Sequence, residues 1–274
     1  MSIVRKGLSF LKRCVPTPKI KVSVSYLSPD HRLEGKKIVV TGGSRGMGFS
    51  MAKKFMKEGA RVLIAGRDEA ALEESAGLLG CPSLRLDVRR IDAFDTFLSD
   101  AWALLDGIDC LVNNAGISHH EPSFLEVGVA DFDTQFDTNV KGAYFLTQKF
   151  VERLVGDKRT GGKILFISSE RGMMADDLPY GLCKAAINSF VQGLATDLAE
   201  YGIRVNALAP GVTATDMTGY HADGNLFNST QATSRVYLPE EMAETACFLL
   251  SDAANLINGQ IIVCNEGKSI NYKR

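Results

Sequence analysis

From residue 36 onward, short runs of apolar residues alternate with longer segments in which apolar residues recur at helical spacing. Short apolar runs bounded by glycine-containing or polar stretches are typical of buried β-strands. We therefore predict strands at residues 37–41, 61–65, 84–88, 109–113, 163–168, 203–208 and 260–263.

The segments between these runs are predicted to be helices. After Gly48, the side chains of Phe49, Ala52, Phe55 and Met56 would share one helix face. Further helices are predicted at residues 68–79, 91–105, 131–154, 180–201 and 239–250.

Strands that alternate with helices of this length form a parallel sheet with helices on both faces. Because such crossovers are right-handed, the pattern predicts a doubly wound α/β (Rossmann) fold with a mostly parallel seven-stranded sheet. We find no linker within it, so we predict a single domain at residues 35–274 that follows a basic N-terminal extension at residues 1–34.

The composition is that of an ordinary globular protein, because 45% of the 274 residues are hydrophobic and 23% are charged. A formal net charge of −1 implies no broad basic field, so nucleic acid is not an expected partner. The six cysteines lie far apart and several stand in apolar runs, which predicts reduced thiols in a cytoplasmic protein. No apolar run approaches the roughly 18 residues that span a bilayer.

The N-terminal extension differs from the rest of the chain, because its first 29 residues carry six basic residues and no acidic one. Apolar residues between positions 3 and 11 would form one face of a short helix, and residues 19–26 alternate as a strand does. A basic amphipathic helix would suit a membrane surface or an organelle-targeting segment. We favour the alternative, an arm that packs on a neighbouring subunit or stays mobile.

A glycine-rich turn follows the first predicted strand and precedes the first helix, with glycines at Gly42, Gly46 and Gly48. Glycine permits a tight turn and lets the backbone approach a pyrophosphate, which then rests at the helix N-terminus. The spacing G-x-x-x-G-x-G differs from the commoner G-x-G-x-x-G fingerprint. Its place after the first strand nevertheless predicts dinucleotide binding.

The end of the second predicted strand indicates which dinucleotide is bound. An NAD site usually carries a carboxylate there for the ribose 2′-hydroxyl, whereas an arginine accommodates the 2′-phosphate of NADP. This strand is followed by Arg67, and Arg45 in the glycine turn could reach the same region. Asp68 stays open as an acceptor one residue later, but we predict NADP.

A tyrosine and a lysine stand four residues apart at Tyr180 and Lys184, in the helix predicted for residues 180–201. Positions i and i+4 share one helix face, so the phenol and the ammonium can point into the same space. A free tyrosine has a pKa near ~10, and a nearby cation lowers that value because it favours the phenolate. Such a tyrosine could protonate a ketone oxygen or deprotonate an alcohol.

These motifs occur in an order that resembles the short-chain dehydrogenase/reductase family, over about residues 35–267. Much of the chain is similar to the branch that contains 3-oxoacyl-carrier-protein reductases, which also holds many sugar, polyol and steroid dehydrogenases. The segments that carry the resemblance are Thr41 to Gly48, Asn113-Asn114-Ala115-Gly116, Ser168-Ser169, Tyr180 to Lys184, Arg204 to Ala207 and Pro210-Gly211.

The resemblance implies a catalytic set of Asn139, Ser169, Tyr180 and Lys184. Tyr180 would be the general acid or base, and Lys184 would lower its pKa and bind the nicotinamide ribose. Ser169 would hold the substrate oxygen, and Asn139 would hold a water for proton relay. Asn113 would steady the central strand.

The charge argument and the resemblance together place the cofactor contacts in the glycine turn, after the second to fourth strands, on the tyrosine helix and after the sixth strand. The candidate contacts are Gly42, Ser44, Arg45, Gly46, Met47, Gly48, Arg67, Asp87, Val88, Asn114, Ala115, Gly116, Tyr180, Lys184, Pro210, Gly211, Thr213 and Thr215.

One spacing departs from the family pattern, in which the serine precedes the tyrosine by about thirteen residues. Ser169 precedes Tyr180 by eleven, so the connection between them is shorter by two residues. Ser168 is the competing assignment, but strand alternation would point it to the opposite face from Ser169. The charged residues Glu170, Arg171, Asp176 and Asp177 are expected to form an exposed loop.

The sequence thus predicts an NADP(H)-dependent oxidoreductase that moves hydride between nicotinamide and a ketone or secondary alcohol, with a 3-oxoacyl or a sugar or polyol substrate. The alternative is a non-catalytic NADP-binding regulatory or scaffold protein. The resemblance implies a homodimer or homotetramer that assembles through the helices at 131–154 and 180–201, and a substrate lid at residues 216–234. His119 and His120 could line the substrate mouth, but no third ligand is indicated, so we predict no metal site.

Overall fold

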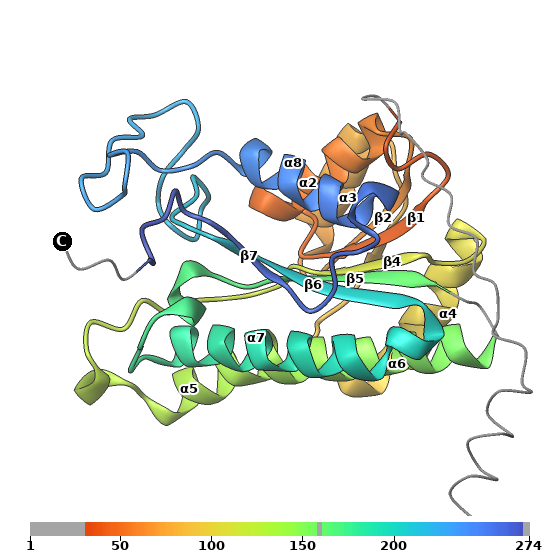
Figure 1. Cartoon of the computed structure of the whole chain (residues 1–274), viewed down its shortest axis with the longest axis horizontal. Coiled ribbons are helices and arrows are strands. Elements are labelled where there is room, and N and C mark those ends of the chain that lie inside the picture. Colours follow the sequence, from red (N-terminus) through yellow and green to blue (C-terminus); the bar gives the residue numbers. More distant parts are fainter. Residues whose placement is uncertain (1–30, 158–160, 271–274) are drawn as a thin grey trace, which may run out of the picture.

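A seven-stranded parallel sheet forms the centre of the molecule (Figure 1). The computed structural model describes residues 31–157 and 161–270, so the helix and strand predicted in the extension lie outside the described residues. The strands are β1 (Lys37–Thr41), β2 (Arg61–Gly66), β3 (Ser83–Arg85), β4 (Cys110–Asn113), β5 (Gly162–Ile167), β6 (Ile203–Pro210) and β7 (Ile261–Cys264). Their order across the sheet is β3-β2-β1-β4-β5-β6-β7, and every adjacent pair is parallel. The predicted fold class is therefore confirmed.

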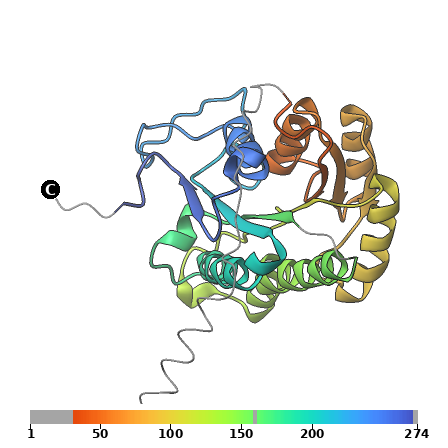
Figure 2. The same cartoon turned by 45° about the vertical axis from the view of Figure 1, so that its right-hand side comes forward.

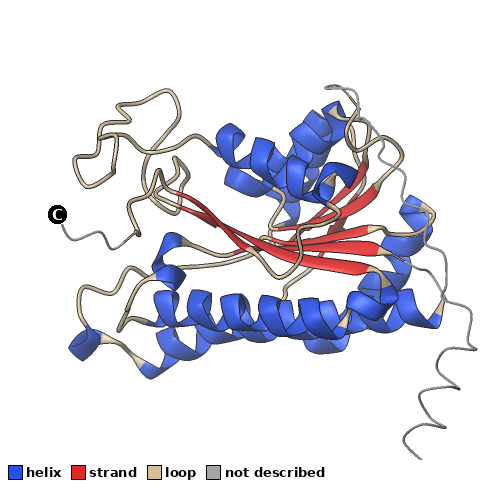
Figure 3. Ribbon diagram, in the orientation of Figure 1, coloured by secondary structure: helices blue, strands red, loops and turns tan. Residues whose placement is uncertain are grey.

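Helices cover both faces of the sheet (Figures 2 and 3). One layer contains α2 (Gly46–Lys57), α3 (Glu69–Leu79) and α8 (Pro239–Leu250). The other layer contains α4 (Phe94–Leu105), α5 (Val129–Phe136), α6 (Ala143–Gly156) and α7 (Pro179–Asp197). Among the described residues, no helix combines the length and apolar character that a membrane span requires.

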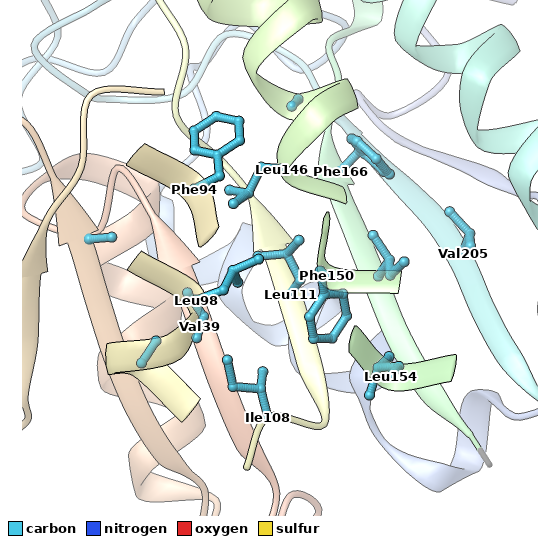
Figure 4. Close-up of a cluster of buried hydrophobic side chains, with 14 of the residues drawn as sticks. Val39, Phe94, Leu98, Ile108, Leu111, Leu146, Phe150, Leu154, Phe166 and Val205 are labelled. Carbon is cyan, nitrogen blue, oxygen red and sulfur yellow. The ribbon is translucent and has the colours of Figure 1, made fainter. Parts of the chain in front are cut away.

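The central strands contain continuous apolar runs because each of their faces belongs to a separate core. Val39 packs in the core beneath α4, α6 and α7, whereas its neighbour Val40 packs in the core beneath α2, α3 and α8. Figure 4 shows the first core, in which Phe94, Phe150 and Phe166 are almost completely buried. Continuous hydrophobic runs are therefore the expected signature of these central strands.

The structure corrects the helix predicted at residues 131–154. Residues Asp137–Gly142 between α5 and α6 form a π-helical turn, so the segment is not one regular α-helix. A Cβ on Gly142 would lie 2.3 Å from the carbonyl oxygen of Val88, so the turn brings the backbone against the chain that leaves β3. Single π turns often occur at functional sites, and this one contains Asn139.

The strand predicted at residues 84–88 is also shorter than expected. β3 ends at Arg85, so Asp87 and Val88 lie in the loop beyond it. The strand lies at the edge of the sheet, where only β2 offers a partner. This places both residues above the carboxyl end of the sheet.

Candidate active site

A cavity of about 530 Å³ lies at the carboxyl ends of β1 to β4. The strand order reverses between β1 and β4, and doubly wound sheets bind ligands at such a switch point. Most of the predicted cofactor residues line it: Gly42, Ser44, Arg45, Gly46, Met47, Gly48, Arg67, Asp87, Val88, Asn114, Ala115, Gly116 and Thr215.

The glycine turn needs glycine for two physical reasons. Gly42 and Gly46 have φ values of 64° and 53°, a region that side chains with a Cβ rarely adopt. A Cβ on Gly48 would lie only 2.1 Å from the carbonyl oxygen of Gly42. No side chain caps the first turn of α2, so its backbone N–H groups are available to an anion.

The turn is held from the neighbouring strand by Asn114. Its side-chain amide donates to the carbonyl oxygens of Thr41 and Gly42, at 2.9 and 3.0 Å. The hydroxyl of Thr41 in turn accepts from the backbone N–H groups of Asn114 and Ala115, both at 3.1 Å. The Asn-Asn-Ala-Gly run and the glycine turn therefore form one hydrogen-bonded unit.

Charged groups gather at the far end of the cavity, beyond β2 and β3. Arg67 is exposed there, and the carboxylate of Asp68 accepts from the backbone N–H of Ala71 as the N-cap of α3. Arg89 binds Asp87 at 2.6 Å and, through this hydrogen bond, holds the pKa of the Asp87 carboxyl below its usual value. Because the Asp68 carboxylate already caps α3, the Arg67 side chain is the more available of the two groups to bind a ligand.

Arg45 points across the cavity toward the segment that follows β6. Its guanidinium lies 3.6 Å from the carboxylate of Asp216, and both side chains are largely exposed. Thr215 packs against the turn, because its Cγ2 lies 3.2 Å from the position that a Cβ would take on Gly46. The start of the predicted lid therefore closes one wall of the cavity.

Ser169, Tyr180 and Lys184 converge near the nicotinamide end that the family resemblance implies. The Ser169 side chain is near enough to the Tyr180 hydroxyl to affect its pKa. Burial raises the pKa of the Tyr180 hydroxyl, whereas the Ser169 side chain and the charge of Arg171 act to lower it. The Lys184 ammonium lies 5.4 Å from the centre of the Tyr180 ring and donates to the carbonyl oxygen of Ile167 at 2.7 Å.

Asn139 links the π turn to the loop after β4. Its Oδ1 accepts from the backbone N–H of Ile117, and its Nδ2 donates to the carbonyl oxygen of Ile117, both at 2.9 Å. A Cβ on Gly116 would lie 2.9 Å from this Oδ1 and 3.7 Å from the Lys184 ammonium. Asn139 and Lys184 therefore lie beside the same wall of the cavity.

Ser168 and Ser169 point to different surroundings, as alternation along a strand requires. The Ser168 hydroxyl donates to Oδ1 of Asn188 at 2.6 Å and is buried against α7. Ser169 instead lies beside the Tyr180 hydroxyl. Only Ser169 is placed to meet a substrate oxygen at the Tyr180 hydroxyl.

The expectation of an exposed charged loop after Ser169 is wrong for three of its four residues. Glu170 is buried and binds the Lys268 ammonium at 2.7 Å, while Arg171 forms an ion pair with Asp176, whose side chain is 7% exposed. Only Asp177 is exposed. The partner of Glu170 is remote in the sequence, so local polarity was a misleading guide.

Three predicted cofactor residues at the end of β6 and just beyond it do not line the cavity, namely Pro210, Gly211 and Thr213, and neither Tyr180 nor Lys184 borders it directly. The Thr213 hydroxyl donates to the carbonyl oxygen of Gly211 at 3.0 Å, which fixes this bend. A Cβ on Gly211 would lie 2.6 Å from the ring of Tyr237. These residues shape the path of the chain toward Thr215.

The sequence did not single out several residues of the cavity wall, among them Leu86, Ile117, Ser118 and Thr138, whereas Asp216 and Met217 of the wall belong to the predicted lid. Thr138 is notable because its hydroxyl oxygen is buried and has no hydrogen-bond partner among residues 31–157 and 161–270. In the sequence, the feature that could have identified Thr138 as a cavity residue is its position immediately before Asn139. The others adjoin recognised motifs but belong to no pattern of their own.

His120 contacts the segment predicted to form the lid. One of its ring nitrogens lies 2.7 Å from the carbonyl oxygen of Met217, and His119 lies 3.9 Å from Asp131. Within the described part of the chain, no three His, Cys, Asp or Glu side chains gather as metal ligands would. His120 therefore connects the loop after β4 to residue 217, and His119 lies beside α5.

Replacing Lys184 with methionine should stabilise the protein near neutral pH by about 1–3 kcal/mol. Burial lowers the pKa of the Lys184 ammonium to about 8, so its charged form is disfavoured in the folded state. Between that pKa and the unfolded value near ~10.4, the unfolded chain binds more protons, so this group makes native stability rise with pH. Urea unfolding from pH 7 to 10 would measure the difference between the native chain and Lys184→Met.

The exposed Lys53 of α2 provides the matched control for that comparison. Lys53→Met removes an exposed ammonium and should change stability little. A Lys184→Met protein that is less stable than the native chain at every pH would contradict the argument.

Comparison with known proteins shows extensive similarity. A family model described as Enoyl-(Acyl carrier protein) reductase matches residues 42–269. The 3-oxoacyl-(acyl-carrier-protein) reductase of Aquifex aeolicus is 32% identical over 246 residues, which cover 86% of this chain and 98% of the relative. The L-rhamnose 1-dehydrogenase (NADP(+)) of Thermoplasma acidophilum is 33% identical over 252 residues, which cover 88% and 98%.

A solved structure supports the same relationship. The 3-ketoacyl-(acyl-carrier-protein) reductase from Brucella melitensis, complexed with NADH, is similar with a TM-score of 0.80 and 32% sequence identity. The match covers 87% of this chain and 100% of that one. The fold is therefore shared along nearly the full length of these relatives.

Proposed function

Because this chain belongs to the short-chain dehydrogenase/reductase family, we propose that it is an NADP(H)-dependent oxidoreductase that acts on a ketone or secondary alcohol. The observation that carries the proposal is the convergence of two side chains on Tyr180: Ser169 acts to lower the pKa of the Tyr180 hydroxyl, and the Lys184 ammonium lies 5.4 Å from the centre of the tyrosine ring. Hydroxyl, phenol and ammonium are the groups that carbonyl reduction requires.

The cavity residues fit a dinucleotide. The backbone N–H groups at the start of α2 would hold the pyrophosphate, and the absence of a side chain at Gly48 lets the turn pack closely against Gly42 and Asn114. The buried hydroxyl of Thr138, which lacks a partner among the described residues, would gain one from a bound ligand. The nicotinamide, when bound, supplies or accepts the hydride.

The protein's own contribution is to orient the substrate and manage the proton. Tyr180 would donate its hydroxyl proton to the carbonyl oxygen in reduction and would accept the proton in oxidation. Ser169 would hold the same oxygen and stabilise the charge that develops on it. The ammonium of Lys184 would favour the phenolate form, and Asn139 would hold a relay water beside the π turn.

The substrate class follows from the relatives, whose names include a 3-oxoacyl reductase and a sugar dehydrogenase. We propose one of these two classes for this chain. NADPH oxidation with 3-oxoacyl thioesters and keto sugars, and NADP+ reduction with aldoses and polyols, would distinguish them. Cofactor binding without turnover of any substrate would instead favour a regulatory or scaffold protein.

The preference for NADP is proposed from Arg67, supported by Arg45. Replacing Arg67 with glutamine should weaken NADP+ binding by about 10-fold to 100-fold and leave NAD+ binding nearly unchanged, because only NADP carries the 2′-phosphate. Fluorescence titration of both cofactors would measure the ratio. Arg90→Gln, which removes an exposed guanidinium paired with Asp92, is the control. Equal weakening of both cofactors would contradict the assignment.

We also propose that the chain forms a homodimer or homotetramer. The helical layer of α5, α6 and α7 carries large, partly exposed apolar side chains, among them Phe132, Tyr144 and Leu182 at 38–41% exposure. Burial of such side chains favours association. Light scattering of the native chain and of Leu182→Lys would test whether this face is the interface.

A further inference from the structure

The connection between Ser169 and Tyr180 is held by an ion pair that the predicted catalytic set does not include. After Ser169, the chain forms the 3₁₀ turn η4 (Glu170–Met173) and then runs to α7, which begins at Pro179. Arg171 lies in η4, and Asp176 lies just before α7. This pair, Arg171 and Asp176, spans the connection that is shorter than the family pattern.

The geometry of the pair is bidentate. Nε of Arg171 donates to Oδ2 of Asp176 at 2.5 Å, and Nη2 donates to Oδ1 at 2.6 Å. Oδ1 also accepts from the backbone N–H of Leu178 at 3.0 Å, at the entrance to α7. The Asp176 side chain is 7% exposed, so this is a buried carboxylate with a complete set of donors.

The connection packs directly on α7 at two levels of the helix. A Cβ on Gly181 would lie 2.0 Å from Oδ2 of Asp176, so the carboxylate occupies the space beside that turn. Further along, a Cβ on Gly172 would lie 2.7 Å from the backbone carbon of Lys184, and Asn188 donates to the carbonyl oxygen of Gly172 at 3.0 Å. The position of η4 on α7 is therefore closely determined.

Arg171 also contacts Ser169 through its backbone. Its N–H donates to the Ser169 hydroxyl oxygen at 3.2 Å, which leaves the serine proton free to serve Tyr180. Because the Arg171 guanidinium is bound to Asp176, the backbone N–H of Arg171, which orients the Ser169 hydroxyl, is held in place. Displacement of η4 would move the Ser169 hydroxyl relative to Tyr180.

We propose that Arg171 and Asp176 are positioning residues. Their ion pair fixes the shortened connection and thereby keeps the Ser169 hydroxyl beside the Tyr180 hydroxyl. The Arg171 side chain is 37% exposed, but the carboxylate is buried, so loss of the arginine leaves an uncompensated buried charge, and loss of the aspartate removes the group that anchors the turn. A displacement of about 1 Å at reacting groups can cost roughly 10²-fold in rate.

The pair has a second, electrostatic effect on Tyr180. Burial raises the pKa of the Tyr180 hydroxyl, the charge of Arg171 acts to lower it, and Cys183 on the same helix acts to raise it. The Lys184 ammonium faces the Tyr180 ring from the same helix. Asp176 partly neutralises Arg171, so removal of the arginine and removal of the aspartate should move this pKa in opposite directions.

Three variants separate the two effects. Arg171→Gln and Asp176→Asn should each lower kcat about tenfold while cofactor affinity stays within twofold, because neither residue lines the cofactor cavity. Arg171→Lys keeps the charge but loses the bidentate geometry, so it should lower kcat without shifting the pH profile. In alcohol oxidation, the profile of Arg171→Gln should shift to higher pH and that of Asp176→Asn to lower pH.

A second readout does not depend on turnover, because the kinetic test rests on the proposed function. Titration of 13C-labelled tyrosine by NMR, with the Tyr180 signal identified in Tyr180→Phe, should show the same opposite shifts. If the native chain turns over no substrate, the proposed function fails but this titration still decides on the pair. The inference would be overturned if Arg171→Gln and Asp176→Asn shifted the pKa of Tyr180 in the same direction or not at all. It would also be overturned if both variants kept the native kcat. If Asp176→Asn does not fold, Arg171→Lys and Arg171→Gln provide the comparison.

Discussion

Replacing Tyr180 with phenylalanine should lower kcat for ketone reduction by about 10³-fold, within the range that general acid catalysis contributes. Phenylalanine preserves the packing of the ring against Lys184 and removes only the hydroxyl that lies beside Ser169. NADPH affinity should remain nearly unchanged, because Tyr180 does not line the cofactor cavity. Steady-state kinetics with a substrate found in the panel, together with cofactor titration, would measure both quantities.

Tyr201→Phe is the matched control for this prediction. Tyr201 ends the short turn that follows α7 and is 39% exposed, so loss of its hydroxyl should leave kcat within twofold. A Tyr180→Phe enzyme with native kcat would remove Tyr180 from the mechanism. A native chain that binds NADPH but shows only background turnover would reject the catalytic proposal altogether.

Replacing Gly48 with alanine should abolish most cofactor binding and destabilise the fold by about 1–3 kcal/mol. The added Cβ would lie 2.1 Å from the carbonyl oxygen of Gly42 and 2.6 Å from the side-chain amide of Asn114. Both neighbours belong to the hydrogen-bonded unit of the glycine turn, so the turn itself must shift. Cofactor titration should show at least tenfold weaker binding, and urea unfolding would measure the stability.

Gly77→Ala provides the control, since Gly77 lies in α3 and no atom outside its own helix turn lies within 4 Å of the position that a Cβ would take. Alanine in an exposed helix position should stabilise the chain by up to about 1 kcal/mol. Native cofactor affinity in Gly48→Ala would show that the turn tolerates a side chain, against the proposed approach of backbone to pyrophosphate.

The fold could be predicted from the sequence because its signals are local. Val39 and Val40 face different cores, so the strand appears as an uninterrupted apolar run with glycine beyond it. The helix that begins at Pro179 carries Tyr180 and Lys184 at a spacing that any α-helix converts into a shared face. Neither inference needs a contact between distant segments.

Other features could not be predicted because their partners lie far along the chain. Glu170 is polar and follows a strand, so it was expected to be exposed, yet its partner Lys268 lies 98 residues away. The π turn at Asn139 depends on the close approach of Gly142 to Val88, and helical periodicity alone continues through it.

The sequence by itself determined the α/β architecture, the position of the glycine turn and the tyrosine–lysine pair, because periodicity and short spacings act within one element. Only the tertiary structure decided which residues form the walls of the cavity, that Arg45 lies beside Asp216, and that Arg171 binds the buried Asp176. The first two features depend on how loops from different strands meet at one edge of the sheet, and the third depends on how the connection after Ser169 packs against α7. Distances between elements are set by packing of the whole core, which no local pattern encodes.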